Sequence, residues 1–179
     1  MRGLMLITGL GLALAGCNSE PSVSMTNASP EEVAAKAKAA GVVSRIRPGQ
    51  WETKVDLVDL DMPGINPAMK AEMLKRSKET KVHSYCVTEE ESKKPGGIFA
   101  DDSGKCTYDK FDMNGGKVDI TMSCPGNGGS ATMHVAGTFT PDAVAATSEM
   151  VTAGQFPMKM KANVASRRTG ECTAPPTAK

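Results

Sequence analysis

From Gly49 onward, most of the chain alternates apolar and polar side chains with a period of two, in short segments separated by turn residues. In the first segment, from Trp51 to Leu57, every second side chain is charged, which is typical of a strand with one buried face. Six further segments follow, at residues 80–87, 105–113, 117–124, 131–139, 144–151 and 158–168. Because short connections join them, the pattern predicts a mainly β fold: an antiparallel meander of about seven strands, strongly curved or barrel-like.

Short helices are expected ahead of the sheet and in its early connections. Ser29-Pro30-Glu31-Glu32 has the order of an N-cap, an N1 proline and a capping box, and an Ala/Lys run follows it. The apolar face of this helix is thin, so we expect a spacer rather than part of the core. Two more helices are predicted, one from Asn66-Pro67 and one from the capping box Thr88-Glu89-Glu90-Glu91.

The N-terminal residues have the organisation of a bacterial lipoprotein signal. Leu14-Ala15-Gly16-Cys17 matches the lipobox, in which the cysteine is acylated and becomes the new N-terminus. Met1-Arg2 gives a positive start, and the uncharged run from Gly3 to Ala13 is too short to span a bilayer. We therefore expect a cleaved signal peptide and lipidation of Cys17, with fatty acyl chains such as palmitate.

The lipobox also sets the expected location and the division of the chain. We expect a lipid-anchored protein on the periplasmic face of the cell envelope, with the membrane as its partner through the N-terminal lipid. Asn18 is not the aspartate that retains lipoproteins in the inner membrane of enteric-type bacteria, so the outer membrane is expected rather than the inner. The expected parts are signal peptide 1–16, lipidated tether and Ala-rich spacer helix 17–46, β domain 47–173 and C-terminal tail 174–179.

Four cysteines remain after Cys17: Cys86, Cys106, Cys124 and Cys172. An even number in an oxidising compartment predicts two disulfides. Zinc is the rival reading, but no C-x-x-C pair is present, and no base accompanies a lone cysteine as a catalytic thiol would require. A two-residue turn after Met113 puts Cys106 and Cys124 on opposite faces of their hairpin, which favours Cys86–Cys106 with Cys124–Cys172. A three-residue loop reverses that argument, so the connectivity stays open.

Composition and motifs argue against several classes of function. With 21 basic and 20 acidic residues, nothing steers the chain toward nucleic acid. The two histidines, His83 and His134, are expected to be structural. The acidic runs at residues 89–91 and 101–102 fit a helix cap and a solvated loop, and the glycine-rich run 125–129 lacks the features of a phosphate loop. We therefore expect no enzyme activity and no cofactor.

Methionine is the unusual residue, with twelve in the chain. Met158 and Met160 are predicted to share a strand face, and Met69 and Met73 a helix face. Methionine fills cores and lines apolar pockets, which is the preferred reading. Soft thioethers also select Cu(I) in oxidising compartments, so Met158 and Met160 are the alternative metal ligands.

Several short motifs resemble those of one protein family. The opening Pro48-Gly49-Gln50-Trp51-Glu52, the cysteine contexts Cys86-Val87-Thr88 and Cys106-Thr107-Tyr108, and the ending Arg168-Thr169-Gly170-Glu171-Cys172 carry the resemblance. On these residues the chain is similar to a family of bacterial envelope lipoproteins known as domain of unknown function 3617. The resemblance covers about residues 47 to 172, and it implies no assigned activity and no catalytic residues.

The sequence therefore predicts a non-enzymatic, lipid-anchored periplasmic protein that binds an apolar ligand or an envelope partner. The alternative is a methionine-based copper-handling or redox protein of the envelope.

Overall fold

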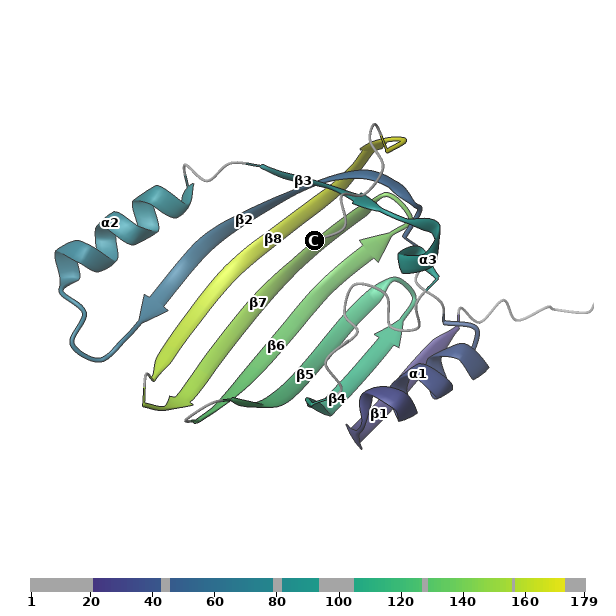
Figure 1. Cartoon of the computed structure of the whole chain (residues 1–179), viewed down its shortest axis with the longest axis horizontal. Helices are drawn as coiled ribbons and strands as arrows, with labels where there is room; N and C mark the ends of the chain where they lie inside the picture. The colour runs from purple at the N-terminus through teal and green to yellow at the C-terminus, as the bar shows by residue number, and fades with distance from the viewer. Residues whose placement is uncertain are drawn as a thin grey trace, which may run out of the picture.

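A computed structural model describes residues 21–42, 46–78, 82–93, 105–126, 129–155 and 157–172. These residues form one antiparallel sheet of eight strands in the order β1-β4-β5-β6-β7-β8-β2-β3 (Figure 1). The strands are β1 (Ser22–Ala28), β2 (Gly49–Asp61), β3 (His83–Val87), β4 (Thr107–Asn114), β5 (Lys117–Gly126), β6 (Gly129–Thr140), β7 (Ala143–Gly154) and β8 (Met158–Gly170). The predicted mainly β, antiparallel fold is confirmed.

The sheet curls without closing into a barrel, because β1 and β3 remain as its two edges. Strands β4 to β8 are successive hairpins, as a meander requires. The long strand β2 then pairs with β8 along most of its length, and β3 adds to the outside of β2. The first long strand of the meander therefore lies beside the last.

In the described ranges, three helices accompany the sheet: α1 (Pro30–Ala39), α2 (Pro67–Lys78) and α3 (Glu89–Ser92). The capping box predicted at Ser29 is present, since its hydroxyl accepts from Glu32 N at 3.2 Å and its own N–H donates to the Glu32 carboxylate at 2.8 Å. The box at Thr88 has the same reciprocal form with Glu91. Both helix starts are thus local consequences of the sequence.

The segment before residue 47 contributes to the sheet and to the core, which the sequence did not indicate. Residues expected to be a tether form β1, which pairs with β4 through Val23↔Met113 and Met25↔Phe111. The helix expected to be a spacer buries Val33 and Ala37 in the core. An edge strand needs only one apolar stripe, and its backbone pairing leaves no mark in a polar sequence, so composition alone misses it. Residues 1–16, Cys17 and the tail 174–179 lie outside the described residues.

The core gathers on one face of the sheet, which we call the inner face. Its centre lies on β4 and β5, where the rings of Tyr108 and Phe111 meet edge to face at 5.4 Å beneath α1. Trp51 of β2 and Val87 of β3 belong to the same cluster, although these strands lie at the opposite edge of the sheet from β1 and β4. The curl of the sheet brings the strands near both edges to one core (Figure 1).

The disulfides are Cys86–Cys172 and Cys106–Cys124, so the favoured pairing of Cys86 with Cys106 and of Cys124 with Cys172 is wrong. The hairpin does have a two-residue loop, with Asn114 paired to Lys117. The register then shifts by one at residue 109, because Lys110 pairs with Thr121 and Tyr108 with Met122.

This β-bulge adds one residue to β4 and reverses the face of everything before it, which puts Cys106 on the side of Cys124. The second bridge follows from the topology. Gln50 of β2 pairs with Cys86 on one side and with Gly170 on the other, so Cys172 lies close to Cys86.

If α1 is part of the core, shortening its buried valine destabilises the whole domain. Val33→Ala removes about two methylene equivalents from a side chain that is 3% exposed. We expect the free energy of unfolding to fall by about 1.5 kcal/mol, measured by urea denaturation followed by tryptophan fluorescence. Val82→Ala, at a side chain that is 51% exposed, is the control and should change little. Equal effects in both variants would contradict the packing of α1.

Candidate functional site

The inner face carries no charged side chain over the described positions of β5 to β7, over Met158–Ser166 of β8 or over Thr53–Leu60 of β2. On β6 to β8 its residues are Ala131, Met133, Val135, Gly137, Phe139, Val144, Ala146, Ser148, Met150, Thr152, Met158, Met160, Ala162, Val164 and Ser166. Most of them are only half-buried, whereas the core under α1 is buried. The middle of the sheet therefore presents an open, uncharged apolar surface.

Four methionines cross this surface in a single transverse row. Met122, Met133, Met150 and Met160 are successive cross-strand partners on β5, β6, β7 and β8. Met122 is buried, and the other three are half-buried. We call this set the methionine row. It lies between Tyr108 of β4, opposite Met122, and Leu60 of β2, opposite Met160.

Small side chains lie on one side of the methionine row, between it and Phe139 of β6 and Val144 of β7. Gly137, Ala146, Ser148 and Ala162 occupy this part of β6 to β8. At Gly137 a Cβ atom would lie 2.2 Å from the carbonyl oxygen of Ala145, so no larger residue fits there without a shift of the strands. We call these four residues the small-residue floor. It lies beside the longer, flexible methionines of the row.

A cleft of about 330 Å³ opens on the other side of the methionine row. It lies at the ends of β5 to β8 and beside Met62, which follows β2. Its lining consists of Met62, Cys124, Pro125, Gly126, Gly129, Ser130, Ala131, Thr152, Ala153, Gln155 and Met158. Met158 and Cys124 are each two positions from a residue of the methionine row, so the cleft and the row form one continuous apolar region.

The outer face of the same strands carries charged side chains, and several of them are paired. Asp119 accepts a hydrogen bond from Lys110 and lies 3.0 Å from Nε2 of His134. Glu149 and Lys161 form a second pair at 2.6 Å. The bond from Lys110 holds the pKa of Asp119 below its usual range, and Lys161 does the same to the pKa of Glu149.

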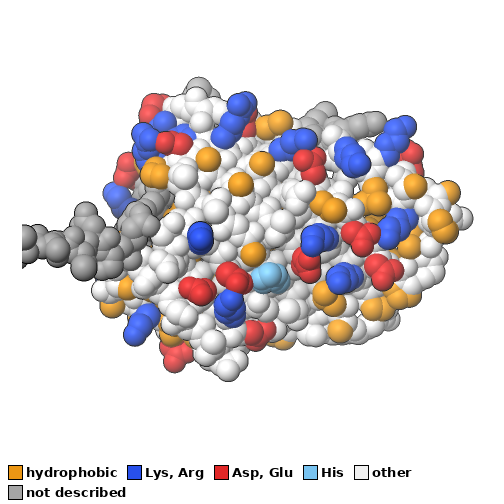
Figure 2. Space-filling model, turned by 180° about the vertical axis from the view of Figure 1, so that it is seen from behind, with side chains coloured by type: hydrophobic (Ala, Val, Ile, Leu, Met, Phe, Trp, Pro, Cys, Tyr) orange, Lys and Arg blue, Asp and Glu red, His pale blue; other side chains and the backbone are white. Residues whose placement is uncertain are grey.

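These pairs leave no large patch of one sign on the outer face, where positive and negative side chains are interspersed (Figure 2). All of the groups involved are partly solvent-exposed, so each pair contributes little to stability. His134 is a partly exposed member of the first of these pairs.

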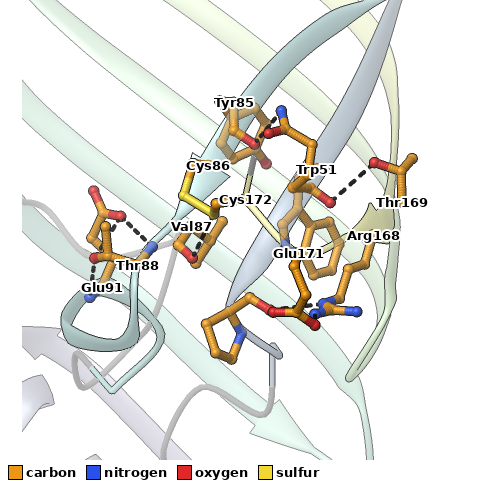
Figure 3. Close-up of a disulfide and its surroundings, with 12 residues drawn as sticks. Trp51, Tyr85, Cys86, Val87, Thr88, Glu91, Arg168, Thr169, Glu171 and Cys172 are labelled. Carbon is orange, nitrogen blue, oxygen red and sulfur yellow. Dashed lines mark hydrogen bonds and ion pairs between the residues drawn. A yellow bond between two sulfur atoms is a disulfide. The ribbon is translucent and has the colours of Figure 1, made fainter. Parts of the chain in front are cut away.

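Three of the four motifs that carried the family resemblance, at residues 48–52, 86–88 and 168–172, meet at one corner of the sheet (Figure 3). Arg168 of β8 donates to the carbonyl oxygen of Pro48 at 2.7 Å and also pairs with Glu171. The indole N–H of Trp51 donates to the carbonyl oxygen of Arg47 at 3.0 Å.

The Cys86–Cys172 bridge ties β3 to the end of this corner. Gly49 has a φ of 139°, and a Cβ atom there would lie 2.3 Å from the carbonyl oxygen of Gly170 and 2.6 Å from Nε of Arg168. These contacts fasten the start of β2 to the end of β8. The corner is a structural joint rather than a binding cleft.

The other residues singled out in the sequence do not contribute to the inner face. Met69 and Met73 of α2 are 59% and 41% exposed, so they line neither the core nor the cleft described above. His83 lies exposed on the edge strand β3. The acidic run 89–91 belongs to the cap of α3, as predicted, and the pair 101–102 lies outside the described residues.

Met158 and Met160 do share a strand face, but they lie in successive rows of the inner face. The sequence did not reveal Met133 and Met150, because the row exists only once the registers of three hairpins are known. The turn residues Pro141-Asp142 and Gly154-Gln155 were the signal available for that alignment. No cluster of three or more His, Cys, Asp or Glu suited to a metal occurs in the part of the chain that the structure describes.

Comparison with known proteins gives one match. The model of a family described as "Protein of unknown function (DUF3617)" matches residues 46–172, which run from just before β2 to Cys172. No curated protein and no solved structure matches the chain. In the described residues, no helix is long and apolar enough to cross a membrane.

The corner joint predicts a large difference between two glycines. Gly49→Ala places a methyl group against backbone and Arg168 at a positive φ, so we expect a loss of about 2 kcal/mol or more in unfolding free energy. Gly170→Ala is the matched control, because no atom lies within 4 Å of the added Cβ. Chemical denaturation of both variants provides the measurement, and an unperturbed Gly49→Ala protein would contradict the joint.

Proposed function

The chain belongs to the DUF3617 family, and we propose that it is a non-enzymatic, lipid-anchored protein of the cell envelope that binds an apolar ligand on the inner face of its sheet. The observation that carries this proposal is the open, uncharged inner face with its methionine row and adjoining cleft. A sheet that served only as a scaffold would gain stability by covering that surface.

The character of the region favours a small ligand over a protein partner. The cleft has the volume of a small-molecule site, and sites of this kind are mostly apolar. Unbranched methionine side chains change rotamer easily and adapt to ligands of different shape. The floor of small residues leaves room above β7 for the ligand to continue beyond the row. An envelope protein as partner is the outcome expected if no small apolar molecule binds.

The absence of enzyme activity is part of the proposal and has its own support. The acidic groups with lowered pKa, Asp59, Asp119 and Glu149, are all on the outer face or beside α2 and are satisfied by lysines. None of them faces the cleft. Ion pairs at a solvated surface account for these pKa values without a catalytic role.

Lipidation at Cys17 and export to the periplasm are proposed from the lipobox, and the two disulfides suit such a compartment. Strand β1 begins at Ser22, five residues after Cys17. Even fully extended, that link spans at most about 17 Å. The anchor would therefore hold the folded unit close to the bilayer, with the outer membrane as the proposed location.

Blocking the small-residue floor tests ligand binding directly. We expect the mature chain, residues 17–179 with Cys17→Ser, to bind the fluorescent apolar probe N-phenyl-1-naphthylamine. Ala146→Phe on the inner face should raise the dissociation constant at least tenfold, because the ring fills the space above the small-residue floor. Ala145→Phe, the next residue and exposed on the outer face, is the matched control and should bind as the parent does. Absence of probe binding to the parent would sink the proposal.

Replacing the lipidated cysteine tests the anchor. The Cys17→Ser precursor offers no thiol for the diacylglycerol, so we expect it to stay uncleaved or to appear in the soluble fraction. Membrane fractionation and mass spectrometry of the N-terminus provide the measurement, with a sucrose gradient of the parent protein to separate the two membranes. A processed Cys17→Ser chain that remains with the membranes would exclude the lipobox.

A further inference from the structure

The methionine row brings thioethers together from three adjacent strands. Met150 of β7 is the direct cross-strand partner of Met133 on β6 and of Met160 on β8. Directly paired residues of an antiparallel sheet have Cβ atoms about 4.5–5.5 Å apart. Because a methionine side chain has three rotatable bonds, the three sulfur atoms can meet above Met150 without any movement of the backbone.

The surroundings of these three side chains restrict what they can bind. The neighbouring inner-face positions hold no charged group, and the thiols of Cys86, Cys106, Cys124 and Cys172 are consumed in disulfides. Hard cations such as Ca²⁺ and Mg²⁺ need oxygen ligands, and Zn²⁺ favours thiolate, imidazole or carboxylate. Neutral thioethers alone suit a soft monovalent ion, of which Cu(I) is the biological example.

Burial of the row is compatible with exchange of such an ion. Met133, Met150 and Met160 are half-buried, so part of each residue is accessible from solvent. Met122, the next residue of the row, is only 8% exposed and closes it on the side of the core.

From this geometry we propose that Met133, Met150 and Met160 bind one Cu(I) ion. The pair suggested by the sequence, Met158 and Met160, is less suitable, because Met158 is the cross-strand partner of Thr152 and has no methionine directly opposite it on β7. Met158 points into the cleft instead. This site does not depend on the binding of an apolar ligand, and either can fail without the other.

Substitution by leucine separates sulfur ligation from apolar packing, because it keeps the volume of the side chain and removes the ligand atom. The test uses the mature chain, residues 17–179 with Cys17→Ser and both disulfides intact, so that no thiol competes. Cu(I) is titrated without oxygen in competition with a chromogenic Cu(I) chelator. We expect one equivalent to bind, with affinity reduced at least tenfold in Met150→Leu and binding abolished in the Met133→Leu/Met150→Leu/Met160→Leu variant.

Two controls define the result. Met69→Leu/Met73→Leu removes an exposed methionine pair on α2, and Met158→Leu removes the cleft methionine, so both should bind Cu(I) as the parent does. The melting curve of the triple leucine variant should match that of the parent, which shows that the variant is folded. No stoichiometric binding by the parent, unchanged binding by a folded triple variant, or loss in either control would overturn the site.

Discussion

The pairing of β2 with β8 is the contact on which the rest of the molecule depends. It joins the beginning of the family-matched region to its end, over registers from Gln50↔Gly170 to Asp61↔Lys159. Through it the inner face gains Leu60 opposite Met160, the corner joint gains Arg168 beside Pro48, and β3 gains a place from which Cys86 reaches Cys172. Without this pairing the hairpins β4 to β8 would have an open edge at β8 and no second side to the core.

Separation of the two faces gives the sheet its chemistry. Several charged side chains of the outer face pair across strands, while the middle of the inner face is uncharged from β5 to β2. Strict alternation would be enough to achieve this in flat, regular strands. Here bulges at residues 109 and 58 each insert one residue, which adds curl and changes which side chains face inward.

Those bulges also mark the limit of what the sequence could predict. The local pattern predicts seven of the eight strands, the short turns between them and both capping boxes, because each depends on residues close together in the chain. The disulfide pairing failed at a single extra residue in β4, and β1 was missed because its partner lies over 80 residues away. For the same reason Met160 was recognised but its neighbours in the row were not, since cross-strand partners are set by register rather than by local composition.

The arrangement of partners along the chain has a consequence for how the protein folds. Strand β2 emerges early during synthesis, yet the strand beside it is the last to be made, so the largest pairing in the molecule has a high contact order. The bridge between Cys106 and Cys124 spans 18 residues and can form within one hairpin, whereas Cys86–Cys172 spans 86 and requires the finished sheet. A loop-entropy estimate gives about 3 kcal/mol for the short bridge and about 4.5 for the long one. We therefore expect Cys106–Cys124 to form first, within its hairpin. The bridge Cys86–Cys172 would follow and stabilise the late pairing of β2 with β8.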